Sequence, residues 1–193
     1  MQKLRVADLM KLEDYAERRP AFRQRVLEHK RQRKLHLGEH LTLLFEDRLT
    51  IQYQVQEMLR IERIFERAGI EEELAAYNPL IPDGGNWKAS CLVEYEDQAE
   101  RARQLEVLKG IERGIWVRVG EGPRIVAVAD EDLERENETK TSAVHFLRFE
   151  LDTASRQAAK TGAVLRFGVD HPAYTLAVEV PEAVRLALVG DLS

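Results

Sequence analysis

The chain has 193 residues, of which 44% are hydrophobic and 33% are charged, and its formal net charge is -5. This balance is typical of a folded globular protein and excludes a disordered chain. The acidic charge disfavours a dedicated nucleic-acid-binding protein, and no apolar run approaches the ~20 residues of a membrane span. A single cysteine, Cys91, excludes an intrachain disulfide. Because the N-terminal segment lacks the apolar core of a signal peptide, we expect a cytoplasmic protein.

The first part of the chain, about residues 1–78, has mostly helical patterns. Pro20 suits the first turn of a helix, and the spacing of leucines falls to two around Gly38. Asn78 precedes a proline, a position that disfavours the helical backbone. The predicted elements are helices over 8–19 and from residue 20, a hairpin over 35–43, a long helix over 46–69 and a short helix over 71–77. In the alternative to the hairpin, the segment LTLLF opens the long helix instead.

The second part, about residues 87–193, has mostly strand patterns. The predicted strands cover 87–95, 115–119, 124–129, 142–151, 163–169 and 174–180, with helices over 97–108, 153–161 and 181–188. Cys91 lies in the first of these strands, where a buried small hydrophobe is expected rather than a nucleophile. The order of elements predicts an α+β fold, with N-terminal helices packed on one face of a mostly antiparallel sheet. We expect one integrated domain over residues 1–193.

Glu62 is an acidic residue at an apolar position of the predicted long helix. At about 100° per residue, the side chains of Ile51, Val55, Met58 and Phe65 form one narrow stripe. Glu62 falls in the middle of that stripe. A carboxylate on a core-facing stripe is costly unless it is paired, protonated or bound to a metal. The pattern therefore predicts a specific partner for Glu62.

Two interpretations of Glu62 stay open. The first is a salt bridge to Arg148, a cation on an otherwise apolar predicted strand. The second is a metal site or general base, assembled from Glu62 or Glu57 together with His145 and His171. Histidine and carboxylate ligands suit iron, manganese or zinc. No two histidines have the spacing that places two ligands on one helix face, so this site would form only through the tertiary fold.

A basic segment over residues 18–34 is the strongest charge feature. Arg23, Lys30 and Arg33 are its candidate partner-binding residues. The segment lacks the interleaved aromatic residues of a single-strand nucleic-acid binder, and a solvated helix face is the simplest alternative. An acidic run over 129–138 has no calcium-loop spacing. It is either solvated or paired with the basic segment, within one subunit or across a homodimer.

Four long segments carry a resemblance to known proteins. They are HLTLLFEDRLTIQYQVQEMLRIERIF, YNPLIPDGGNWKAS, ADEDLERENETKTSAVHFLRFEL and GVDHPAY. Together they resemble a bacterial family known only as a domain of unknown function, over nearly the whole chain. The resemblance implies no activity or ligand. Such genes are often found beside those for rubrerythrin-like di-iron proteins and iron–sulfur oxidoreductases, which implies a role in a redox system.

Three functional hypotheses follow from these observations. The first is a non-catalytic accessory or interaction protein that serves an iron–sulfur or di-iron redox system. The second is a metal-dependent redox or hydrolytic enzyme with the Glu/His site described above. The third is a nucleic-acid-binding regulator that uses the basic segment, which the acidic net charge disfavours.

Overall fold

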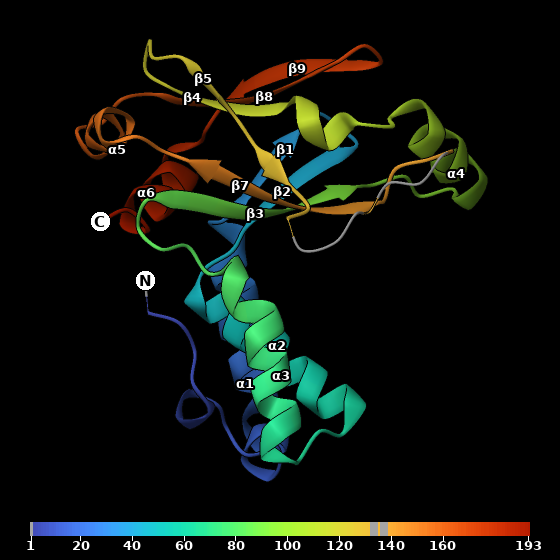
Figure 1. The fold of residues 1–193 in the computed structure, drawn as a ribbon, viewed down its shortest axis with the longest axis vertical. Helices are drawn as coiled ribbons and strands as arrows, with labels where there is room; N and C mark the ends of the chain where they lie inside the picture. The colour runs from blue at the N-terminus through green and yellow to red at the C-terminus, as the bar shows by residue number, and fades with distance from the viewer. Residues whose placement is uncertain (1, 132–134, 136–138) are drawn as a thin grey trace.

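A computed structural model describes residues 2–131, 135 and 139–193 of the chain. In this part, a helical arm projects from a body of two antiparallel sheets (Figure 1). The helices are η1 (Val6–Asp8), α1 (Leu12–Arg31), α2 (Arg48–Glu62), α3 (Arg67–Tyr77), η2 (Asn78–Leu80), α4 (Gln98–Val107), η3 (Ile111–Gly114), α5 (Thr153–Lys160) and α6 (Glu182–Gly190). The strands are β1 (Lys34–Leu37), β2 (Leu41–Phe45), β3 (Asn86–Val93), β4 (Ile115–Val119), β5 (Arg124–Val126), β6 (Val128–Ala129), β7 (Val144–Glu150), β8 (Leu165–His171) and β9 (Tyr174–Glu179).

The two sheets face each other and enclose the main core. The larger sheet has the strand order β1-β2-β3-β7-β6, and the smaller sheet has the order β5-β4-β8-β9. Phe167 of the smaller sheet lies 5.1 Å, between ring centroids, from both Phe45 and Phe149 of the larger sheet. The predicted α+β class is confirmed. The strands form two sheets, and the predicted strand over 124–129 breaks at Ala127, so that its halves join different sheets.

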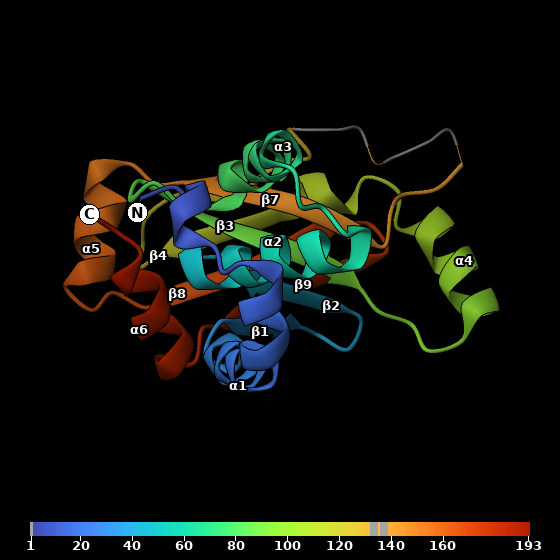
Figure 2. The same ribbon diagram turned by 90° about the horizontal axis from the view of Figure 1, so that it is seen from below.

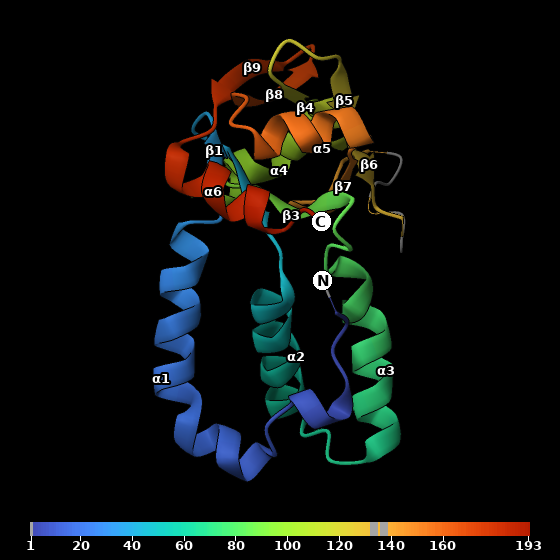
Figure 3. The same ribbon diagram turned by 90° about the vertical axis from the view of Figure 1, so that its left-hand side faces the viewer.

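The arm consists of α1, α2 and α3 (Figure 3), and it has a hydrophobic cluster of its own. Ile51, Val55 and Leu59 of α2 form the buried stripe of this cluster. The prediction of separate helices before and after Pro20 is wrong, because α1 runs through this residue. Proline removes only one backbone donor from the helical ladder, and the buried side chains of Tyr15 and Val26 hold both halves of α1 in place.

The helix predicted to extend to Gly69 ends at Glu62. Arg63 has a left-handed backbone with φ of 56°, and its N–H donates to the carbonyl of Leu59. This is a common way to end a helix, although glycine usually supplies the left-handed residue. Gly69 lies inside α3 instead. The predicted helix end at Tyr77 and the predicted hairpin of β1 and β2 are both confirmed.

A buried ion cluster joins the base of the arm to the C-terminal residues. The guanidinium of Arg33 binds the carboxylate of Asp191, and its Nη1 lies 3.4 Å from Oδ2 of Asp47. Nε2 of His29 lies 2.5 Å from the same Asp47 oxygen. Burial raises the pKa of Asp191 to about 6 against the opposing effect of Arg33, and the nearby charge of Asp47 adds to the rise. This cluster fixes the arm relative to the body.

The remaining helices lie at the two ends of the strands. Seen from below in Figure 2, α4 lies at one end, and α5 and α6 lie at the other. In the residues that the structure describes, no helix combines the length and the apolar character needed to cross a membrane. Of the acidic run over 129–138, residues 132–134 and 136–138 lie outside the described residues. The expectation that this run pairs with the basic segment therefore stays a prediction.

Candidate functional site

The face of the larger sheet that turns away from the core meets the arm. Strand pairing places its outward side chains in rows that cross β2, β3 and β7. The rows are Thr42, Leu92 and Val144; Leu44, Ser90 and Phe146; and Lys88 with Arg148. Two of these rows have an apolar side chain on β7, which is unusual for a sheet face turned to solvent.

Three neighbouring hollows lie along this face beside the arm. Their volumes are about 950, 260 and 520 Å³. The first and second share Leu92 and Val144 as lining residues, and the second and third share Tyr77, Leu80 and Phe146. Because neighbouring hollows share lining residues, the three follow one another along this face, and we call this row of hollows the groove.

The first end of the groove is acidic. Oγ1 of Thr42 donates to Oε2 of Glu94 at 2.5 Å and lies 3.0 Å from Nδ1 of His36. The ring of His40 stacks on Tyr95 at 3.9 Å. The other charged lining residues are Glu39, Glu96, Asp97, Glu100 and Arg101. Carboxylates outnumber cations here, so this end favours a positively charged ligand group.

The middle of the groove contains a buried carboxylate beneath an apolar wall. Oε1 of Glu46 accepts from Ser90 at 2.6 Å, and Oε2 accepts from Thr50 at 2.5 Å. These two hydrogen bonds satisfy a side chain that joins the arm to the sheet. The Lys30 ammonium lies 5.8 Å from the ring centroid of Tyr53 and reaches the groove from α1.

The far end of the groove is a network of cations and acids. Arg148 binds both carboxylate oxygens of Glu131 at 2.8 Å and one of Glu150 at 2.6 Å. Lys88 donates to the carbonyl of Pro79 in the arm. Burial lowers the pKa of Lys88, and the Asp83 charge partly offsets this. Arg148 is thus neutralised within its own sheet face.

Glu62 does not have the buried position that its stripe predicts. It is exposed at the last position of α2. The stripe stops there because Arg63 leaves the helical conformation, and Phe65 beyond it is 65% exposed. The predicted salt bridge to Arg148 is therefore wrong, since Arg148 pairs with Glu131 and Glu150.

Glu57, the other carboxylate of the predicted metal site, has protein partners inside the arm. Its Oε1 accepts from the hydroxyl of Tyr15 at 2.6 Å and from Nε of Arg19 at 2.7 Å. Arg19 also donates to Oε2 at 2.8 Å. The hydrogen bonds from Arg19 lower the pKa of Glu57 to about 2, against the opposing effect of burial. Glu57 thus joins α1 to α2.

His145 is buried inside the body. Its Nδ1 lies 2.6 Å from Asp130, and its Nε2 lies 2.9 Å from Oγ1 of Thr141. His171 uses both ring nitrogens at the end of β8: Nε2 donates to the Lys109 carbonyl at 3.1 Å, and Nδ1 accepts from the Ala173 N–H at 3.2 Å. Both histidines are satisfied by the protein itself.

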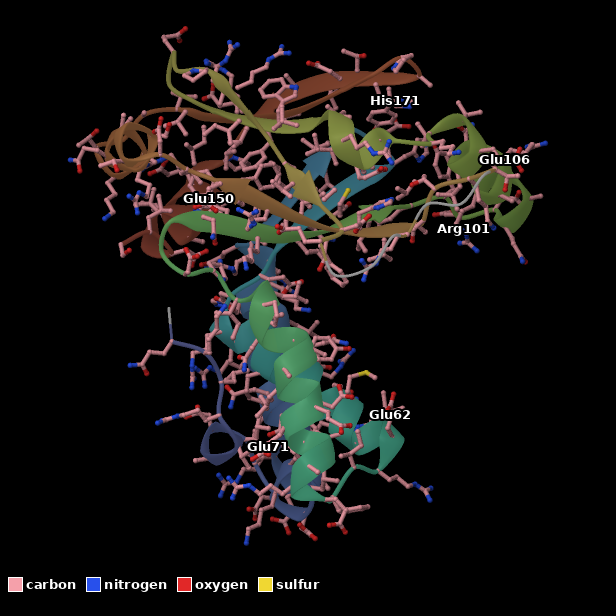
Figure 4. The ribbon with its side chains drawn as sticks, in the orientation of Figure 1. Glu62, Glu71, Arg101, Glu106, Glu150 and His171 are labelled. Carbon is pink, nitrogen blue, oxygen red and sulfur yellow. The ribbon has the colours of Figure 1, made fainter. Side chains whose placement is uncertain are left out.

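The structure does not bring the four predicted metal ligands together. Figure 4 shows Glu62 in the arm and His171 among the strands of the body. Within the described ranges, no group of three or more His, Cys, Asp or Glu side chains could hold a metal ion. The metal site stays a hypothesis that metal analysis can test.

The predicted partner-binding residues lie in different environments. Arg23 is exposed on α1, and Lys30 is half-buried at the groove. Arg33 is only 3% exposed and is held in the ion cluster, so it cannot contact a partner from this position. Cys91 is buried as expected, and burial raises its pKa to about 12, which keeps the thiol protonated at neutral pH.

Sequence reasoning missed the polar cluster of His36, Thr42 and Glu94. The signal was present in part, because a hairpin centred on Gly38 places His36 directly opposite Thr42. Glu94 directly follows a different strand, β3, whose pairing with β2 is not coded by a local pattern. Only the fold brings these three side chains together.

The fold and the groove define an α+β protein with an elongated surface site. The chain belongs to the family described as protein of unknown function (DUF3501), whose model matches residues 3–192. A crystal structure described as a novel protein of unknown function from Burkholderia pseudomallei is similar to this chain, with 48% sequence identity, 100% of both chains covered and a TM-score of 0.95. No curated protein matches the chain. The resemblance to a family of unknown function is confirmed.

Proposed function

We propose that this protein is a cytoplasmic accessory protein that binds an extended segment of a redox partner in the groove. The partner is an iron–sulfur protein or a rubrerythrin-like di-iron protein, the classes that the family resemblance implies. The observation that carries the proposal is the groove, a row of three neighbouring hollows in which the partly exposed side chains of Leu92, Val144 and Phe146 lie between two charged ends.

The dimensions of the groove suit a peptide segment. From Lys88 to Glu94 the chain advances about 20 Å, at roughly 3.3 Å per residue. An extended segment of about six residues has the same length. Apolar side chains of such a segment would cover Val144, which is 36% exposed, and Phe146 beside it. Removing this apolar surface from water favours binding by roughly 25 cal/mol per Å².

The charges of the groove indicate where the bound segment has charges of its own. Glu94, Glu96 and Asp97 at the first end favour a basic residue of the partner. Lys30 lies in the middle of the groove and favours an acidic residue there. The partner segment therefore has a basic end followed by apolar residues and an acidic residue.

The experiment is a binding titration with a purified partner of each class, in which binding is measured by biolayer interferometry at two salt concentrations. Val144→Asp places a charge on the apolar wall of the groove and should weaken binding about tenfold or more. Val164→Asp is the matched control, because Val164 is 37% exposed and lies outside the groove. Circular dichroism shows whether both variants stay folded.

Lys30→Glu tests the charge pattern separately. We expect weaker binding and a smaller dependence on salt, whereas Arg103→Glu, an equal charge reversal on exposed α4, should leave binding unchanged. Equal affinities for the Val144→Asp and Val164→Asp variants would refute the groove as the binding site. If folded wild-type protein binds neither class of partner, the proposed function fails.

A further inference from the structure

The outer face of the smaller sheet lies on the far side of the body from the arm (Figure 1). On β4, Ile115, Val117 and Val119 point into the core, so Trp116 and Arg118 point outward. This face is separate from the groove, and nothing in the proposed function uses it.

Three arginines form a row across this face. Arg118 of β4 lies directly opposite Arg124 of β5 and also opposite Arg166 of β8. Like charges in directly opposed cross-strand positions repel each other. The two outer arginines have carboxylate partners: Arg124 binds Asp170, and Arg166 lies 3.4 Å from Glu179. In the part of the chain that the structure describes, the central Arg118 forms no ion pair.

Two buried hydrogen-bond donors lie on this face, one from the central arginine of the row and one from Trp116 in the neighbouring row. Across the described ranges, Nε1 of Trp116 and Nε of Arg118 are the buried side-chain nitrogen and oxygen atoms that have no hydrogen-bond partner. They come from residues two apart on one strand and therefore on one face. Trp116 as a whole is only 4% exposed. Buried donors without an acceptor are rare in folded proteins, and a water or an ion that binds beside them is one explanation.

The surroundings of these donors are cationic. The guanidinium carbon of Arg124 lies 4.1 Å from the ring centroid of Trp116, and that of Arg118 lies 6.0 Å from it. Three arginines thus face three carboxylates: Asp170, Glu179 and Glu121, which lies 3.9 Å from Arg166. Among the described residues, Arg118 is the arginine of this row that forms no ion pair. An anion with several acceptor oxygens would satisfy the donors and reduce the repulsion in the row.

We propose that Trp116, Arg118, Arg124 and Arg166 form a binding site for a phosphate group. A tetrahedral oxyanion presents several acceptor oxygens, which match the planar donors of a guanidinium group. Access to the site is through Arg124, whose side chain is 45% exposed and pairs with the 46% exposed Asp170. Exposed ion pairs of this kind are weak, so Arg124 can exchange Asp170 for a phosphate oxygen.

The indole N–H of Trp116 is a direct reporter of this site. The chain has two tryptophans, and the other, Trp87, donates its indole N–H to the carbonyl of Leu188 at 2.8 Å inside the body. In a ¹H–¹⁵N spectrum of the labelled protein, inorganic phosphate should shift the Trp116 indole signal saturably. The Trp87 signal should stay in place and serves as the internal control.

Two variants of Arg118 test the donors. Arg118→Gln should weaken phosphate binding about tenfold or more, because a charge-assisted hydrogen bond is lost. Arg118→Lys keeps the charge but loses the planar donors, and it should also weaken binding. Arg103→Gln, an exposed arginine on α4, is the matched control and should bind like the wild type.

Further titrations with other ligands distinguish the possible sources of the phosphate group. Tighter binding of inorganic phosphate than of ribose 5-phosphate identifies the free ion, and the reverse order identifies a phosphate monoester. An equal shift with sodium chloride at the same ionic strength would refute the site. It would also be refuted if the Trp116 signal responded to protein dilution rather than to phosphate, because a second copy of the chain would then cover this face.

Discussion

Removal of Arg33 is the most stringent test of how the arm is held to the body. Arg33→Met keeps most of the apolar stem of the side chain and removes the guanidinium that Asp47 and Asp191 share. Asp47 and Asp191 are only 6% and 5% exposed, so both carboxylates then stay buried without the guanidinium. Breaking a buried pair in this way costs about 3–5 kcal/mol of the free energy of unfolding.

The expected change in melting temperature follows from the size of the chain. Unfolding entropy of about 2.1 cal/mol/K per residue over 193 residues gives about 0.4 kcal/mol/K. A loss of about 3–5 kcal/mol therefore lowers the melting temperature by about 7–12 °C. Arg31→Met is the matched control, since Arg31 and Glu28 form an exposed pair with side chains 76% and 65% exposed. Such pairs contribute less than about 1 kcal/mol.

The loss should also depend on pH. Burial raises the pKa of Asp191 to about 6, above its unfolded value near 3.8. A raised carboxyl pKa favours folding below the unfolded value, and this contribution is lost as the pH rises through about 6. Below about pH 5, Asp191 of the folded protein is protonated and needs Arg33 less. The Arg33→Met variant should therefore lose more stability at pH 8 than at pH 5.

Differential scanning calorimetry at both pH values measures these effects. A decrease no larger than that of Arg31→Met, or one that is equal at pH 5 and pH 8, would refute the role of the ion cluster. The same scans of the wild-type protein test the prediction of one integrated domain. That prediction requires a single transition, and separate transitions for the arm and the body would contradict it.

Two further predictions concern the residues of the proposed metal site. Glu57→Gln should lower the free energy of unfolding by about 1–2 kcal/mol at pH 7. In urea titrations this loss should shrink as the pH falls toward 2. The lowered pKa of Glu57 stabilises the folded protein above about pH 4.5, and this contribution is lost as the pH falls through about 2. An equal loss at pH 7 and pH 2 would contradict this. For metal binding, elemental analysis of untagged protein purified without chelators and oxygen should find no stoichiometric iron, manganese or zinc, because Glu57, His145 and His171 have protein partners. Stoichiometric metal that disappears in folded Glu62→Gln would instead establish the metal hypothesis.

The predicted features that the structure confirms depend on local patterns. Alternation of apolar residues predicted the strands around Cys91 and Leu147, and the turn at Gly38 predicted the first hairpin. The proline after Asn78 predicted the end of α3. Each of these signals lies within a few residues of the element it determines, so no tertiary information was needed.

Glu62 shows where the local pattern stopped being sufficient. Its stripe is correct as far as Val55, but the left-handed backbone of Arg63 ends the helix at Glu62. A non-glycine residue in this conformation has no strong sequence signal. The assignment of Arg148 as its partner failed for a related reason, because Glu131 competes for Arg148 through the pairing of β6 with β7.

The sequence by itself determined the α+β class, most of the strands and the likeness to a family of unknown function. Only the tertiary structure decided that the strands form two sheets, that a groove runs beside the arm, and that Arg118 lies between Arg124 and Arg166. The physical reason is the distance along the sequence over which each interaction acts. Helical and strand periodicities arise from the backbone over a few residues, whereas the register between distant strands depends on which side chains the whole core can bury together.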